Sequence, residues 1–269
     1  LEEERTLLTS NDMPAPNSPE TLLSTGGPDE FGYTWDDSVP LASISAAGGV
    51  DTGINSSVEY SGALNLGFTF RYYENSYTQL FVSRHGYASF NDVDLYRWQS
   101  YIPDPSTPND VIAPYWVPTD TANYVRYLTG GTEPNRYFVV EWNNLVHSDE
   151  SYNFELILHE NGDIVFQYGT ITLLDSRACE ASGIEDSTGL DGLSITQFCY
   201  PIASNHAVRI YRPAVAARVN LSPLVQGQLT HAGATVVFPI TVRNSGELGA
   251  DTYNLSVTSA WPTTLYAAN

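Results

Sequence analysis

The segment from Arg136 to Gly169 constrains the fold of this chain more than any other. Its apolar residues alternate with polar or smaller ones. Phe138, Val140 and Trp142 form one alternating run, and Phe154, Leu156 and Leu158 form a second. A period of two places one face of a strand in a core and the other in or near water. Asn161-Gly162 then precedes another apolar run, which is a strong hairpin signal because a type I′ turn needs positive φ at both central residues. The segment is therefore predicted to be an antiparallel meander.

The acidic residues of this meander fall on its polar face. Glu141, Glu155 and Asp163 could form the paired carboxylates of a glycosidase, which needs two of them about 5–10 Å apart. A solvent-exposed sheet face explains the same positions more simply. We therefore expect all three side chains to face water.

Short runs of strand-forming residues separated by Gly, Pro, Asn and Asp continue through the chain, and no segment has a helical period. This pattern is typical of an all-β protein. We predict an extended arm over residues 1–26, an antiparallel, jelly-roll-like β-sandwich over 27–212 and a linker over 213–218. The strands predicted within residues 219–269 suit an Ig-like β-sandwich, but about seven strands and roughly 100 residues are needed to complete one. This last unit is therefore expected to be incomplete.

The charge of the chain excludes two classes of partner. Its formal net charge is −20, and its basic residues are all arginines. Nucleic acids and anionic membrane surfaces both require clustered basic residues, so we expect neither. No apolar run is long enough for direct membrane insertion. An acidic surface suits a soluble extracellular protein or a binder of divalent cations.

Two further patterns are typical of exported proteins. Cys179 and Cys199 flank a Gly-rich loop of about 20 residues, the arrangement expected of a structural disulfide. Asn55, Asn220 and Asn254 each begin an Asn-X-Ser pattern and are candidate glycosylation sites. The Asn-X-Ser pattern also arises by chance in a chain rich in Asn, Ser and Thr.

No motif for catalysis is recognisable. The histidines, which are His85, His147, His159, His206 and His231, lie outside any nucleophile elbow or zinc helix. Ser83-Arg84-His85-Gly86 is the most suggestive context, because a tight connection between strands could expose the imidazole. We predict that the chain is not an enzyme; a calcium-dependent hydrolase with an unrecognised site is the enzymatic alternative.

No cofactor is expected apart from structural calcium, which prefers several oxygen ligands from loops. The candidate ligands are Asp92, Asp94, Glu185, Asp186 and Asp191. None of these clusters has EF-hand spacing, and turns use Asp in the same way.

Aromatic residues are concentrated near predicted loops. Exposed aromatic side chains stack on sugars and dominate protein interfaces. The candidate interaction surface consists of Tyr72, Tyr73, Tyr77, Tyr96, Trp98 and Tyr101. The alternative is that these residues close the ends of the sandwich.

Several segments resemble a module of bacterial secreted and surface proteins that is related in outline to the nidogen-like extracellular domain. They are GPDEFGYTWDDS (27–38), LGFTFRYYENSYTQLFVSRHGYASF (66–90), PNDVIAPYW (108–116), PNRYFVVEWNNLVH (134–147), FELILHENGDIVFQYG (154–169) and GIEDSTGLDGLSI (183–195). After Trp116, the module typically has acidic residues where this chain has Val117-Pro118-Thr119-Asp120, which weakens any cation site inferred there. Residues 219–265 are similar to Ig-like repeats found beside glycosidases and proteases, through Tyr253, Leu255, Trp261 and Pro262.

The resemblance implies an accessory, extracellular role, because such modules occur in adhesins, in anchored surface proteins and in the C-terminal regions of secreted subtilisin-like proteases. We expect a non-catalytic structural protein for surface attachment or self-assembly, with copies of itself, other surface proteins or carbohydrate as partners. An arm that adds a strand to the open edge of another copy would build a filament. The alternatives are an accessory ligand-binding region of a secreted subtilisin-like protease or other hydrolase, and a fragment of a longer protein.

Replacing both Cys179 and Cys199 with serine tests the disulfide. The double variant should lose ~2–4 kcal/mol of unfolding free energy, because a bridge closing a loop of about 20 residues restricts the unfolded chain. Denaturant melts of both proteins measure the loss. Unchanged melting, or two free thiols in the denatured wild type, would rule out the bridge.

Overall fold

The computed structural model describes residues 24–91, 101–173, 181–196, 202–214, 219–222, 225–231, 233–244, 246 and 252–266. These residues form strands and contain no helix, so none of them supplies a membrane-spanning helix. Contacts divide the chain into two compact units, Leu1–Pro213 and Ala214–Asn269. The predicted all-β class is confirmed.

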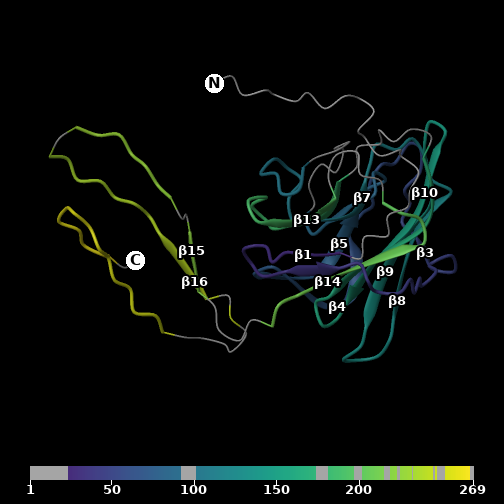
Figure 1. Cartoon of the computed structure of the whole chain (residues 1–269), viewed down its shortest axis with the longest axis horizontal. Coiled ribbons are helices and arrows are strands. Elements are labelled where there is room, and N and C mark those ends of the chain that lie inside the picture. Colours follow the sequence, from purple (N-terminus) through teal and green to yellow (C-terminus); the bar gives the residue numbers. More distant parts are fainter. Residues whose placement is uncertain are drawn as a thin grey trace, which may run out of the picture. The chain divides into compact units, whose positions relative to one another are not determined.

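Two antiparallel sheets form the sandwich of the first unit (Figure 1). The larger sheet has the order β1-β2-β14-β11-β10-β9-β8-β3. Its strands are β1 (Thr25–Gly26), β2 (Thr34–Asp36), β3 (Val50–Asp51), β8 (Tyr124–Gly130), β9 (Tyr137–His147), β10 (Glu150–His159), β11 (Ile164–Thr172) and β14 (His206–Tyr211). The smaller sheet has the order β13-β12-β7-β6-β5-β4. Its strands are β4 (Leu64–Tyr72), β5 (Asn75–Val82), β6 (Ala88–Ser89), β7 (Val111–Trp116), β12 (Ala181–Glu185) and β13 (Gly192–Thr196).

The predicted meander is confirmed as β9, β10 and β11, in which Leu156 pairs with both Val140 and Phe166. The turn type differs from the prediction. A type I′ turn needs positive φ at both Asn161 and Gly162, but only Gly162 has it (97°). The Gly162 amide donates to the carbonyl of His159 (2.8 Å), and the His159 amide donates to the carbonyl of Asp163 (2.9 Å). This is the geometry of a type I turn followed by a left-handed glycine, another common hairpin connection.

Aromatic side chains fill the space between the sheets. Trp142 is fully buried, and its ring lies 5.1 Å from that of Phe154, centroid to centroid. Its indole nitrogen donates to the carbonyl of Ser83 (2.9 Å), which satisfies the one polar group of the side chain. The Tyr168 hydroxyl similarly donates to the carbonyl of Pro114 (2.8 Å). Both bonds run from the larger sheet to the smaller sheet or its connections.

Pro114 lies in β7, between β6 and β12 and not at an edge. The sequence predicts either an edge or a bulge here, because proline cannot donate to a neighbouring strand. The structure has the bulge: the β7–β12 register shifts between Ala181, which pairs with Trp116, and Gly183, which pairs with Ala113.

The acidic side chains of the meander are buried, so the expectation that they face water is wrong. Glu141, Glu155 and Asp163 keep only 8, 6 and 7% of their surface exposed. Asp163 is held by the Arg209 guanidinium and the backbone amide of Arg212. The two glutamates are covered by residues 40–47, named the strap below, which cross the outer face of the larger sheet. The strand pattern cannot reveal this cover, because it comes from a distant part of the chain.

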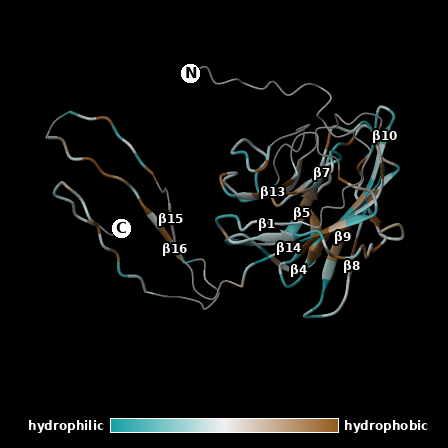
Figure 2. Cartoon of the chain, viewed as in Figure 1, coloured by the Kyte–Doolittle hydropathy of each residue, from teal (hydrophilic) through white to brown (hydrophobic). Residues whose placement is uncertain are grey.

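In the second unit, the described residues include a two-stranded sheet formed by β15 (Val219–Ser222) and β16 (Thr241–Asn244). Apolar stretches recur along its trace (Figure 2). Many of its large apolar side chains are exposed, including Leu229 (101%) and Trp261 (79%). The Ig-like identity of this unit stays a prediction.

Trp142→Ala should lower the unfolding free energy by ~3–5 kcal/mol, because it leaves a cavity and removes the hydrogen bond that Trp142 donates to the Ser83 carbonyl. Denaturant titration followed by circular dichroism would measure the change. The matched control is Trp261→Ala, which changes an exposed tryptophan and should alter stability by less than about 0.5 kcal/mol. Equal effects of the two substitutions would contradict the assignment of Trp142 to the core.

Candidate functional site

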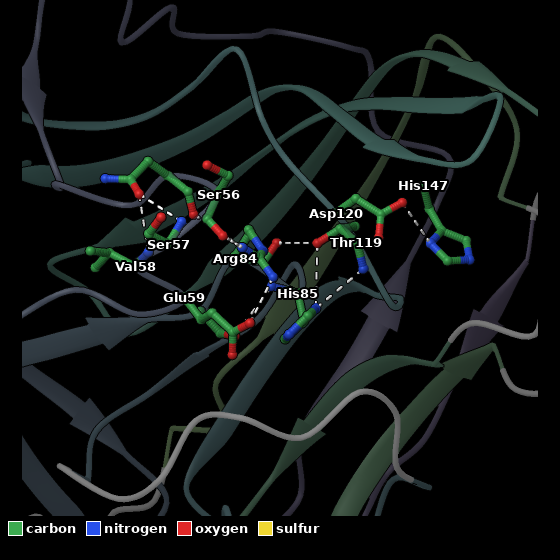
Figure 3. A network of polar contacts seen from close by, with 11 residues as sticks. Ser56, Ser57, Val58, Glu59, Arg84, His85, Thr119, Asp120 and His147 are labelled. Carbon is green, nitrogen blue, oxygen red and sulfur yellow. Dashed lines mark hydrogen bonds and ion pairs between the residues drawn. The ribbon is translucent and has the colours of Figure 1, made fainter.

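The corner between β5 and β6 is the catalytic context suggested by the sequence (Figure 3). It turns at Gly86, whose φ is +78°. A Cβ at this position would lie 2.0 Å from the carbonyl oxygen of Tyr115, so only glycine fits. The corner is thereby pressed against β7.

Arg84 is buried, and its guanidinium fastens a neighbouring loop. One terminal nitrogen donates to the carbonyls of Asn55 and Ser56, both at 3.1 Å, and the other pairs with Glu59 at 2.8 Å. Backbone carbonyls and a carboxylate thus bind both terminal nitrogens of the guanidinium. These contacts give Arg84 a structural role, because they attach the loop of residues 55–59 to the β5–β6 corner.

His85 is also buried, and its Nδ1 accepts the amide proton of Thr119 (3.2 Å). Burial, helped by the nearby charge of Arg84, lowers the pKa of His85 to about 4. The imidazole therefore stays neutral at neutral pH, with its proton on Nε2. Closer to the surface, His147 Nδ1 lies 3.4 Å from a carboxylate oxygen of Asp120, and both side chains are exposed. Neither histidine is placed beside an activated nucleophile by these contacts.

The described calcium candidates bind backbone amides. Glu185 is buried and accepts the amide proton of Asp104 (3.0 Å). Asp186 accepts the amides of Thr188 and Leu190 within its own turn, and Asp191 accepts those of Glu30 and Phe31. Asp92 and Asp94 lie outside the described residues. Within the described ranges no three His, Cys, Asp or Glu side chains are grouped to hold a metal. Calcium binding stays a prediction.

Tyr72 and Tyr73 are buried, so their assignment to an interaction surface is wrong. The Tyr72 hydroxyl donates to the carbonyls of Val111 and Glu185, and the Tyr73 hydroxyl to Asp29. Two successive residues of a regular strand would point to opposite faces. Tyr73 instead takes positive φ (47°) just after β4 ends, and both rings turn inward.

The other aromatic candidates have different positions. Tyr77 is half-buried, stacks on Phe90 at 4.4 Å and donates to Asp110. Tyr101 keeps 54% of its surface exposed. Tyr96 and Trp98 lie outside the described residues. Of the described candidates, only Tyr101 and part of Tyr77 are therefore accessible for an interaction.

The candidate modification sites are only partly described. Asn55 is exposed, and its side-chain oxygen accepts the amides of Ser57 and Val58 in a turn. Asn254 is exposed in the second unit, whereas of Asn220 only the backbone, in β15, is described. Cys179 and Cys199 both lie outside the described residues, so their pairing stays a prediction.

A hollow that the sequence did not indicate lies where β1, β2 and β14 meet. It has a volume of about 360 Å³ and is lined by Thr25, Gly26, Gly27, Thr34, Trp35, Asp36 and Tyr211. Tyr211 pairs with Thr34 in the sheet, and the guanidinium of Arg209 lies 5.0 Å from the Tyr211 ring. Hydrogen bonds from Ser38 lower the pKa of Asp36, so its carboxylate is ionised. An aromatic ring, two threonines and a carboxylate suit a small polar ligand, and a strand pattern could not reveal them because they come from distant segments.

Arg84→Met should lower the unfolding free energy by about 2–4 kcal/mol, because it leaves two carbonyls and the Glu59 carboxylate without their cationic partner. Thermal and denaturant melts would measure this. Arg71→Met removes a charge from an exposed position on β4 and should cost less than about 1 kcal/mol. Similar losses in the two variants would contradict a structural role of the Arg84 network.

Comparison with known proteins gives one match. A family model described as NIDO related matches residues 33–215, the greater part of the chain. Searches of curated proteins and of solved structures returned no match. The matched range covers most of the sandwich and most of the segments that resemble the nidogen-like module.

Proposed function

Because this chain belongs to the NIDO-related family, we propose that it is a non-catalytic extracellular structural module that mediates surface attachment or self-assembly. The family match carries this proposal, because the NIDO-related domain is an extracellular type of module and not a catalytic one. Fold alone would not assign such a role.

The contacts of the polar residues support a structural role. His85 is neutral and buried against Thr119, and Arg84 is bound to a loop. Glu185 and Asp191 accept backbone amides. The histidine, arginine and carboxylate side chains that were candidates for catalysis or calcium binding therefore hold loops and connections of the sandwich in place.

The second unit supports self-assembly. A two-stranded sheet is at best marginally stable alone, and exposed apolar side chains mark interaction sites. Val225, Leu229 and Tyr266 are each more than four-fifths exposed, and they would be covered if strands from another molecule completed the unit. Strand donation by the N-terminal arm is the form of assembly that we propose.

The fold limits which part of the arm could be donated. Thr25 and Gly26 already pair with Asp36 and Trp35 of the same molecule, and the carbonyl of Ser24 accepts the amide of Asp37 (3.1 Å). A donor strand would therefore come from residues 1–23. If residues 24–26 were deleted as well, β1 would be lost. A change in assembly could then come from damage to the larger sheet and not from loss of the donor strand.

Light scattering of the full chain and of a version beginning at Ser24 tests the proposal. We expect the full chain to form species of several subunits as its concentration rises, and the shortened chain to stay monomeric. A chain with residues 1–23 in scrambled order is the matched control, because it keeps the length and charge of the arm. If the full chain is monomeric throughout, self-assembly by strand donation is excluded.

A second candidate is an accessory ligand-binding region of a secreted subtilisin-like protease or other hydrolase. The hollow lined by Thr34, Asp36 and Tyr211 favours it, because a polar ligand could meet an aromatic ring and hydrogen-bonding groups there. Monomers in every light-scattering experiment would make this the leading proposal.

A further inference from the structure

The strap carries an inference that does not depend on the proposed function. Residues 40–47 connect β2, near one edge of the larger sheet, to β3 at the other edge. Alternate amides of the strap donate to side chains of three successive strands. Ala42 donates to Gln167 (3.0 Å), Ile44 to Glu155 (2.8 Å) and Ala46 to Glu141 (2.6 Å).

The acceptors form one row across the outer face of the sheet. Glu155 pairs directly with Glu141 on one side and with Gln167 on the other. Arg126 of β8 pairs with Glu141, and its guanidinium donates to the carbonyl of Ala47. Four neighbouring strands thus each contribute one side chain that binds the backbone of the strap.

An apolar patch lies beside this row. Val139, Ile157 and Val165 pair across β9, β10 and β11, and Ile44 of the strap packs against them. The three valine and isoleucine side chains of the sheet are buried. The strap therefore covers both two buried carboxylates and a patch of apolar surface.

The two carboxylates are not equivalent. Glu141 accepts from the backbone amide of Ala46, from the hydroxyls of Ser45 (3.2 Å) and Tyr124 (2.7 Å), and from the side-chain amide of Asn143 (3.3 Å). Among the described residues, Ile44 alone donates a hydrogen bond to Glu155. Two adjacent buried carboxylates resist joint ionisation, and a proton is taken up most readily by the carboxylate that has the fewest hydrogen-bond donors. The proton of the pair therefore belongs on Glu155.

The remaining charged groups around Glu155 do not alter this assignment. Arg126 lies beyond Glu141 in the row and also faces Asp51 of β3, 3.7 Å away. Burial raises the pKa of Tyr124 to about 12, so that hydroxyl stays protonated. The strap has no charged side chain. Burial raises the pKa of Glu155 most, the amide of Ile44 lowers it, and the charge of Glu141 raises it again, so that the pKa lies at about 7 instead of its ordinary value of 4.5.

We propose that the strap is a pH-dependent clamp, closed over the outer face of the larger sheet when Glu155 is protonated and loosened when Glu155 ionises. A lifted strap returns Glu155 to water, where it ionises at its ordinary pKa. The closed state thus binds the proton more tightly, so its extra stability is complete below pH 4.5 and is lost as the pH rises through 7. Loosening uncovers Val139, Ile157 and Val165, against which Ile44 packs in the closed state.

Amide hydrogen exchange of the full chain tests the clamp. The protection factors of Ala42, Ile44 and Ala46, corrected for the intrinsic rate at each pH, should fall by about ten- to a hundredfold between pH 5 and 8.5. The amide of Leu156 in β10 reports global opening and should change much less. Glu155→Gln should remove the fall, because glutamine keeps an acceptor for Ile44 and cannot ionise. Glu133→Gln, which changes an exposed glutamate, should leave the fall as in the wild type.

A flat pH profile in the wild type, or an equal fall in Glu155→Gln, would overturn the proposal. Should Glu155→Gln fail to fold, the carboxyl carbon of Glu155 in the wild type gives the answer by NMR titration. A midpoint near 7, matched by the amide shifts of the strap, is expected. A midpoint near 4.5 would exclude the clamp.

Discussion

Burial of aromatic side chains between two sheets is the interaction on which the first unit depends. The rings of Trp142, Phe154, Tyr115 and Tyr168 contact one another in the centre, and the polar ends of Trp142 and Tyr168 donate to carbonyls on the opposite side. An aromatic ring contributes a large apolar area, and each satisfied polar end removes the cost of burying it. These bonds also fix the sheets in register, because each donor must meet one particular carbonyl.

Acidic side chains have an unusual share in the rest of the architecture. Carboxylates bind backbone amides in several places: Asp29 and Asp191 hold the loop after β1, Glu185 holds Asp104, and Glu141 holds the strap. A carboxylate that accepts several amide protons is a strong acceptor. Part of the net charge of −20 is therefore structural and not only a property of the surface.

The sequence predicts what local periodicity determines. The meander β9–β11 and its core face follow from alternation, and the missing amide of proline predicts either an edge or a bulge at Pro114, of which the structure has the bulge. The burial of Tyr73 could not be predicted, because it depends on one residue with positive φ. The cover over Glu141 and Glu155 and the hollow beside Tyr211 depend on segments distant in sequence. For such sites a strand pattern identifies the face of each residue but not what lies against it.

The positions of β1 and β14 determine how the first unit would respond to mechanical tension. Thr25, Asp36 and Arg209 lie level across β1, β2 and β14, so β1 and β14 run in the same direction with β2 between them. The chain enters at the start of β1 and leaves at the end of β14. Pulling on the two ends would slide these strands past each other, loading their hydrogen bonds together and not one after another. The rest of the larger sheet would lie outside the line of force.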